Sequence, residues 1–134
     1  MIYELVLLQL NKSNSEDREY MENNPTAKEI AKSIVRKIKG YFGNKTGSFS
    51  IYDLTDDPYS MFNITFDAYN YFFVTFSYNR GSIGCSISQG QYGLELKNSQ
   101  QWYDSADWDI FLKELQDQLE LRIPDKFLES TGWK

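Results

Sequence analysis

The stretch MFNITFDAYNYFFVTFSYNRGSIGCSI, residues 61–87, decides the fold of this chain. Its apolar residues fall on every second position, first over 61–68 and again over 71–78. A period of two is typical of a β-strand that buries one face. Asn70 and the Asn-Arg-Gly triplet at 79–81 interrupt the pattern, and such interruptions favour tight hairpin turns. The stretch therefore predicts consecutive antiparallel strands.

Strand patterns continue on both sides of this stretch. The first 10 residues are nearly continuous in apolar side chains, which favours a central strand, whereas 11–24 is polar and predicts an exposed loop. In chain order, we expect strands over residues 2–10, 48–54, 61–68, 71–78, 82–88 and 92–97. Short turns join the last five, which predicts an antiparallel meander.

Two amphipathic helices flank the meander. The first opens at Asn24-Pro25-Thr26, where Asn24 is able to cap, Pro25 suits the first helical position, and Thr26 has capping-box spacing to Glu29. Its apolar residues then recur at helical spacing until Gly40 or Gly43 ends it.

The second helix is expected to begin with Asp104 or Ser105 as its cap and to stop near Ile123, because Pro124 follows. One more helical turn is expected over 124–128. The buried stripe of this helix comprises Trp108, Phe111, Leu112, Leu115 and Leu119. The fold predicted for the single domain 1–134 is α+β: one antiparallel sheet of about five to six strands, with two main helices packed on one face.

The charge of the chain is concentrated near its end. The whole protein carries a net charge of −5, and between Glu95 and Asp125 eight carboxylates and three basic residues also give −5. The remainder is therefore close to balance. A concentrated negative surface attracts cationic partners and repels nucleic acid.

The sequence lacks the residues that the commonest enzymatic sites require. It has no histidine and a single cysteine, which excludes Ser-His-Asp and Cys-His nucleophiles and histidine- or cysteine-rich zinc sites. Cys85 lies in a strand pattern and is interpreted as a buried, inert thiol. We therefore predict a protein that is not an enzyme, with no catalytic, cofactor-binding or metal-ligating residues.

The location that the sequence favours is the cytoplasm. A lone cysteine cannot form an internal disulfide, which fits a reducing compartment. The first 10 residues lack the basic start and cleavage pattern of a signal peptide, and no apolar run reaches the roughly 20 residues that span a membrane.

Charged helix faces have an ordinary explanation that competes with any functional one. The carboxylates of the second helix and of the 53–57 turn are by default solvated surface, and a partner-binding face is the alternative. The first helix and its flank, 24–47, carry six basic residues and one acid. Nucleic-acid binding is disfavoured there because the protein is acidic overall and no aromatic residue is interleaved on that face.

The last third of the chain resembles the tail of a known class of proteins. Residues 102–115 (WYDSADWDIFLKEL), 119–128 (LELRIPDKFL) and the final Gly132-Trp133 look like the tail of small bacterial immunity proteins, which accompany polymorphic toxins and contact-dependent growth-inhibition toxins. The resemblance implies a cytoplasmic protein that binds a cognate toxin domain and blocks its active site or its activation. Many such toxins are basic nucleases, which an acidic partner suits.

The partner-binding residues expected on this basis form two groups. The first is the acidic helix with its aromatic flank: Trp102, Tyr103, Asp104, Asp107, Asp109, Glu114, Asp117 and Glu120. The second is the loop that contains Asp53, Asp56, Asp57 and Tyr59. The expected partner is a toxin C-terminal domain, with no nucleic acid and no membrane, and the protein itself is expected to be a monomer or weak homodimer. The alternatives are an acidic adaptor or structural module and, less favoured, a histidine-free hydrolase or small-ligand binder.

Overall fold

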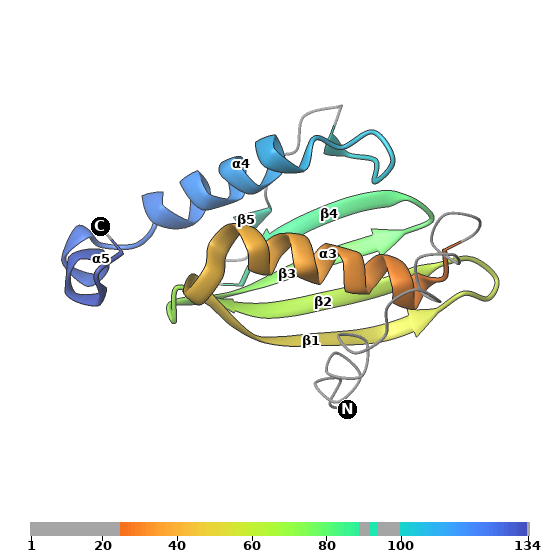
Figure 1. The fold of residues 1–134 in the computed structure, drawn as a ribbon, viewed down its shortest axis with the longest axis horizontal. Coiled ribbons are helices and arrows are strands. Elements are labelled where there is room, and N and C mark those ends of the chain that lie inside the picture. Colours follow the sequence, from red (N-terminus) through yellow and green to blue (C-terminus); the bar gives the residue numbers. More distant parts are fainter. Residues whose placement is uncertain (1–24, 89–91, 94–99, 134) are drawn as a thin grey trace.

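The protein is an α+β fold in which helices cover one face of an open antiparallel sheet (Figure 1). The computed structural model describes residues 25–88, 92–93 and 100–133. The strand expected at 2–10, the loop at 11–24 and most of the strand expected at 92–97 lie outside these residues. Within the described residues, no helix is both long enough and apolar enough to cross a membrane.

The sheet is a meander, as the sequence predicts. Its strands are β1 (Thr46–Thr55), β2 (Met61–Ala68), β3 (Phe72–Asn79), β4 (Ser82–Ile87) and the two-residue β5 (Tyr92–Gly93). They pair antiparallel in chain order, β1-β2-β3-β4-β5. The described sheet thus has four long strands and a short fifth at its edge, fewer complete strands than the five to six expected.

The alternation over residues 61–78 places one apolar row in the core. Ile64 is paired with Phe76 and Phe66 with Val74, and all four side chains are buried. The intervening residues are half-buried or exposed and point to the opposite face, which none of the described helices covers and which we call the helix-free face. The hairpin between β3 and β4 has two central residues, Arg80 and Gly81, both with positive φ, the conformation that matches the twist of a tight hairpin.

The first helix, α3 (Ala27–Phe42), starts at a capping box. The Thr26 side chain accepts a hydrogen bond from the Glu29 amide, and the Glu29 carboxylate accepts one from the Thr26 amide. Thr26 is therefore the cap, and Pro25 lies before the helix rather than at its first position. Gly43, at a φ of 58°, ends the helix, as one of the two expected glycines. A short 3-10 turn, η1 (Gly43–Lys45), leads into β1.

Two further helices follow the sheet. The cap of α4 (Trp108–Leu121) is Asp107, so the expectation of Asp104 or Ser105 was wrong by two or three residues. The terminal turn expected at 124–128 is a separate seven-residue helix, α5 (Asp125–Thr131), so the described residues form three α-helices rather than two main ones. Pro124 begins it, because a proline cannot continue α4 but is tolerated where a new helix starts.

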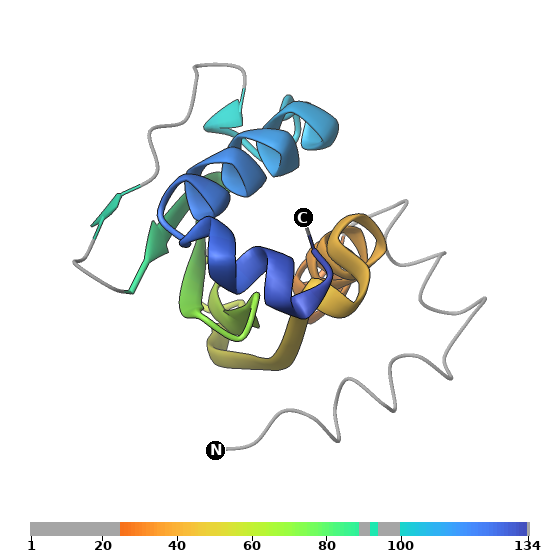
Figure 2. The same cartoon turned by 90° about the vertical axis from the view of Figure 1, so that its left-hand side faces the viewer.

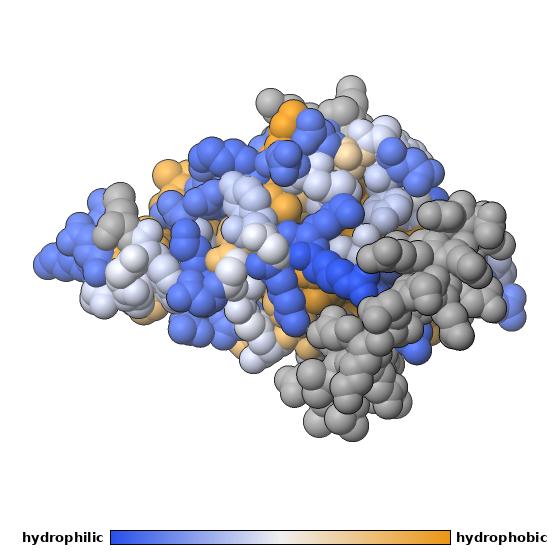
Figure 3. Space-filling view, in the orientation of Figure 1, coloured by the Kyte–Doolittle hydropathy of each residue, from blue (hydrophilic) through white to orange (hydrophobic). Residues whose placement is uncertain are grey.

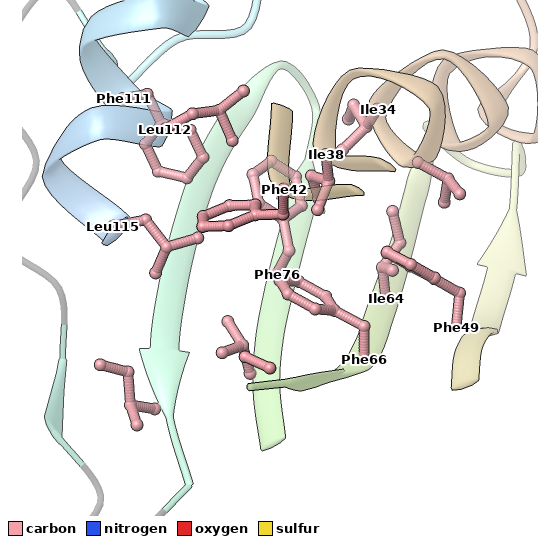
Figure 4. Packing of buried hydrophobic residues seen from close by; sticks show 14 of the residues in the cluster. Ile34, Ile38, Phe42, Phe49, Ile64, Phe66, Phe76, Phe111, Leu112 and Leu115 are labelled. Carbon is pink, nitrogen blue, oxygen red and sulfur yellow. The ribbon is translucent and has the colours of Figure 1, made fainter. Parts of the chain in front are cut away.

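The core lies between the sheet and the helices α3 and α4. Both helices occupy the same side of the sheet (Figure 2), and Figure 4 shows their apolar side chains directed onto the strands. The predicted stripe of α4 is confirmed for Phe111, Leu112, Leu115 and Leu119, which are buried, while Trp108 is half-buried against the core. Within α3, Ile34 and Ile38 are fully buried.

Candidate partner-binding surface

Two acidic, aromatic segments that are far apart in sequence meet at one end of the sheet. These segments are the β1–β2 loop, 56–60, and the segment before α4, 101–107. The β3–β4 turn lies between them and bonds to both. At the right-hand end of the sheet in Figure 1, this turn, the β1–β2 loop and the beginning of α3 come together. We call this region the hairpin end of the sheet.

The loop side of the hairpin end is held to the turn by Arg80. Its backbone amide donates a 2.9 Å hydrogen bond to the Ser60 carbonyl, and its guanidinium lies 4.2 Å from the centre of the Tyr59 ring. A cation at this distance from an aromatic face is attracted to it. Tyr59 remains 36% exposed. The pair therefore presents an ordered aromatic surface beside a cation.

The other side of the turn holds the segment before α4. The Tyr103 amide donates a 2.8 Å hydrogen bond to the Gly81 carbonyl, and Trp102 forms an isolated antiparallel bridge with Ser82. These backbone contacts fix Trp102 although its side chain is 54% exposed. A β-carbon added to Gly81 would lie 4.0 Å from the Trp102 ring, so the ring sits against the turn. Trp102 is thus an exposed aromatic residue on a fixed backbone.

Tyr103 has a different environment from its neighbour. Its half-buried ring packs edge-on against Tyr78 and Trp108, with ring centroids 5.8 and 6.1 Å away. Tyr103 therefore contributes more to the core than to the exposed surface.

Carboxylates of both acidic segments influence the pKa of the Tyr78 hydroxyl. Burial raises the pKa of Tyr78, and the charges of Asp104 and then Tyr103 and Asp56 raise it further. Asp104 belongs to the segment before α4 and Asp56 to the β1–β2 loop. Both carboxylates are exposed. The two candidate segments therefore contribute negative charge to the same end of the molecule.

Two of the predicted partner-binding carboxylates accept hydrogen bonds from backbone amides in the first turn of a helix. One oxygen of Asp56 accepts 2.8 Å hydrogen bonds from the Ala27 amide and the Ser60 hydroxyl. Asp107 accepts a 3.2 Å bond from the Ile110 amide as the cap of α4. The positive end of a helix dipole accounts for an acid at each position. Asp57 and Asp104, both exposed, are the carboxylates of the hairpin end that have no such cap role.

The carboxylates further along α4 do not share one surface with the hairpin end. Asp109 is exposed in the first turn, but Asp117 is paired with Lys113 at 2.6 Å, and that hydrogen bond raises the pKa of the lysine. Glu120 accepts a hydrogen bond from the Tyr69 hydroxyl, next to the β2–β3 turn at the opposite end of the sheet. Glu114 is half-buried.

Asp53 lies close to the hairpin end in the chain, but on the other face of the sheet. It accepts a 3.3 Å hydrogen bond from the Asn63 amide group, which belongs to the helix-free face of the sheet. Of the acidic segment that the sequence singles out, residues Glu95 and Lys97 lie outside the described part of the chain.

Several exposed side chains were not among the predicted site residues. Arg80 belongs to a turn that sequence reasoning used only as a structural signal. Elsewhere in the described chain, the exposed large hydrophobic residues are Tyr41, Tyr71, Phe73, Ile110 and Leu121. The helical period signals the two on α4, because it leaves both outside the buried stripe.

The described residues offer little for catalysis by the lone thiol or for metal binding. Burial raises the pKa of the Cys85 thiol to about 12, so the thiol stays protonated and weakly nucleophilic near neutral pH. Within the described part of the chain, no group of three or more Cys, Asp or Glu side chains is arranged to hold a metal ion.

Comparisons with protein-family models, with curated proteins and with solved structures found no match to this chain.

Proposed function

We propose that this protein is an immunity protein that binds a cognate toxin domain and neutralises it through the hairpin end of the sheet. The observation that carries the proposal is the meeting of two separately chosen segments, around Tyr59 and around Trp102, at one end of the fold. Sequence reasoning selected both segments for their acidic and aromatic residues without information on their distance.

The composition of this surface fits protein recognition. Exposed Trp and Tyr residues are enriched among the side chains that dominate binding energy at interfaces. Here the backbone of Trp102 is held by the bridge to Ser82 and the ring of Tyr59 lies against Arg80, so little of this surface has to be ordered on binding. Asp57 and Asp104 add negative charge at the same end.

The partner proposed is a basic toxin domain, and a nuclease fits best. A protein with a net charge of −5 is attracted to a basic surface, and electrostatic steering accelerates association. The carboxylates would take the place of nucleic-acid phosphates on the toxin, so that its active site or its activation is blocked. In this proposal the protein acts by binding, in the cytoplasm, and has no catalytic residues of its own.

Co-expression with the toxin domain encoded next to this protein tests the proposal. We expect growth to be rescued by the unmodified protein and lost with a Trp102→Ala, Tyr59→Ala, Asp104→Lys triple variant. Glu129→Lys, an exposed change in α5 at the far end of the chain, is the matched control and should still rescue.

Each other outcome has a defined meaning. If the unmodified protein neither binds nor neutralises the toxin, the immunity function is wrong. If it neutralises but the triple variant does so equally well, the function stands and the hairpin end is the wrong surface. Capture of a defined non-toxin partner, with no effect on the toxin, would instead favour an adaptor module.

A further inference from the structure

Two neighbouring helices of this protein carry opposite charge. Over Ala27–Phe42, α3 has five basic residues and one acid, a net charge of +4. Over Trp108–Leu121, α4 has four acids and one lysine, a net charge of −3. The two lie side by side on one face of the sheet: the Tyr41 hydroxyl donates a 2.6 Å hydrogen bond to Gln116, and the Lys37 ammonium lies 6.0 Å from the Trp108 ring.

The charges nearest the contact between the helices remain available to another molecule. Lys37 leans toward the Trp108 ring on one side of α3, and Lys39 toward the Phe49 ring on the other, at 5.4 Å. Arg36 lies on the outward face between them and is exposed. Within the described residues, neither Arg36 nor the exposed Asp109 of α4 forms an ion pair.

The outward face of α3 is not uniform along its length. In the first half, Glu29, Lys32 and Ser33 are buried although they point away from the sheet. Only the second half, from Arg36 to Tyr41, presents exposed side chains on that face. Any contact on this helix is therefore confined to its second half.

Gly40 lies on this second half, and the described residues show no contact or backbone conformation that requires a glycine there. Its φ is not positive, and a β-carbon placed there would meet no heavy atom within 4 Å. Glycine inside a helix is less favourable than alanine. The described residues thus leave open space beside Gly40, where a second backbone has room to approach this face closely.

We propose that this layer of α3 and α4 is a self-association surface, in which a second copy packs about a two-fold axis that runs along the helices. Both helices begin toward the hairpin end, α3 next to Asp56 and α4 after the segment that bonds to Gly81. A two-fold axis parallel to them and midway between them places the basic helix of each copy on the acidic helix of the other.

The register of the two helices within one chain fixes which residues meet. Since Lys37 lies beside Trp108 and Tyr41 beside Gln116, the second half of α3 is level with the first half of α4. Rotation about an axis parallel to the helices does not change the position of a residue along that axis. Arg36 of one copy therefore faces the Asp109 region of the other, and the symmetry repeats the contact. Figure 3 views this layer, where hydrophilic side chains gather over both helices.

A second copy fits this surface better than an unrelated partner. A basic or an acidic ligand would complement only one of the two helices, whereas the same surface rotated by 180° complements both. The net charge of −5 on each copy opposes association, so the dimer is expected to be weak and to form at high protein concentration. The inference does not depend on the proposed function, and its test involves no toxin.

Sedimentation velocity over a wide concentration series, with Arg36→Glu and Asp109→Lys variants, tests the inference. Each variant alone places like charges in contact twice, so its dimer should weaken roughly tenfold or more. An equimolar mixture of the two should recover association as a heterodimer. In that heterodimer the two substituted side chains meet with opposite charges, and the unchanged Arg36 of one variant meets the unchanged Asp109 of the other. Lys28→Glu carries the same change of charge roughly 12 Å along the helix and should leave the dimer unchanged.

Gly40→Ala supplies a second measurement, because the substitution should affect the stability of the monomer and the stability of the dimer in opposite directions. Alanine should raise the unfolding temperature of the monomer and weaken the dimer, since the added methyl group lies between the copies. A wild-type protein that stays monomeric throughout the series overturns the inference. So does a dimer that neither charge variant weakens, or a mixture that shows no heterodimer while both variants remain folded by circular dichroism.

Discussion

The Asp56 carboxylate accepts a 2.8 Å hydrogen bond from the backbone amide of Ala27, 29 residues earlier in the chain. Ala27 is the first residue of α3, and its amide is one of the donors that no helical carbonyl can satisfy. The bond ties the loop after β1 to the beginning of α3. It also explains why an acid from a distant loop is present at this position.

Asp56→Ala is expected to lower the free energy of unfolding by about 1 kcal/mol, the usual cost of a lost helix cap. Urea denaturation followed by circular dichroism measures the change. Asp57→Ala, the neighbouring exposed acid, should change stability by less than about 0.5 kcal/mol. If both variants lost the same free energy of unfolding, the hydrogen bond to Ala27 would contribute nothing measurable to stability.

Tyr69 should make stability fall at alkaline pH. Burial, followed by the hydrogen bond and charge of Glu120, raises the pKa of this tyrosine far above its usual value near 10. Above that value the unfolded chain releases the proton while the folded protein retains it. The stabilisation is therefore complete below about pH 10 and is lost as the pH rises, with a limiting slope of about 1.4 kcal/mol per pH unit.

Tyr69→Phe should flatten this alkaline decline, and urea titrations at several pH values on either side of the tyrosine pKa measure it. The variant should also be less stable near neutrality by roughly 1–3 kcal/mol, because the partly buried Glu120 carboxylate loses the Tyr69 donor and keeps the Gln116 amide. Tyr71→Phe, at an exposed ring, is the matched control. The raised pKa of Tyr78 predicts that a smaller decline persists. An unchanged slope in Tyr69→Phe would contradict the assignment.

Two leucines of α4 should differ sharply in their tolerance of alanine. Leu115 is buried in the core, whereas Leu121 is 78% exposed. Leu115→Ala is expected to cost about 2–5 kcal/mol, through lost burial and the cavity that remains. Leu121→Ala should cost less than about 0.5 kcal/mol. Thermal and urea denaturation of the pair check the orientation of the helix, and similar losses would mean that the helix is rotated.

Trp102 should matter for binding and not for folding. If the hairpin end binds the toxin, Trp102→Ala is expected to weaken the complex by at least about 2 kcal/mol, which is roughly 30-fold in Kd. Because the ring is more than half exposed, the unfolding midpoint should move little. Calorimetric titration with the toxin domain, alongside urea denaturation, separates the two. A large loss of stability with unchanged affinity would assign Trp102 to the fold instead.

The local elements were predictable because their signals are short-range. The period of two over 61–78 gave β2 at its observed bounds and β3 within one residue. The Thr26–Glu29 capping box fixed the start of α3. The start of α4 was misplaced because several acids and a serine between 104 and 109 are all competent caps, and only the backbone conformation distinguishes them.

The candidate surface could be predicted only in part. Both segments were predicted from their acidic and aromatic residues, but sequence alone treated them as a first and a second candidate and assigned all the carboxylates of α4 to the first. Glu120 instead faces Tyr69 at the other end of the sheet, and Asp53 faces Asn63 on the helix-free face. Arg80, which orders Tyr59, was counted only as a turn residue.

The sequence by itself determined the α+β class, the meander, the buried stripes of the helices and the acidic balance, because periodicity and composition depend on neighbouring residues. Only the tertiary structure decided which carboxylates cap helices, which are bound to distant tyrosines and amides, and which stand exposed beside Trp102 and Tyr59. The physical reason is that the β3–β4 turn brings together segments more than 40 residues apart. No local pattern in either segment encodes that distance.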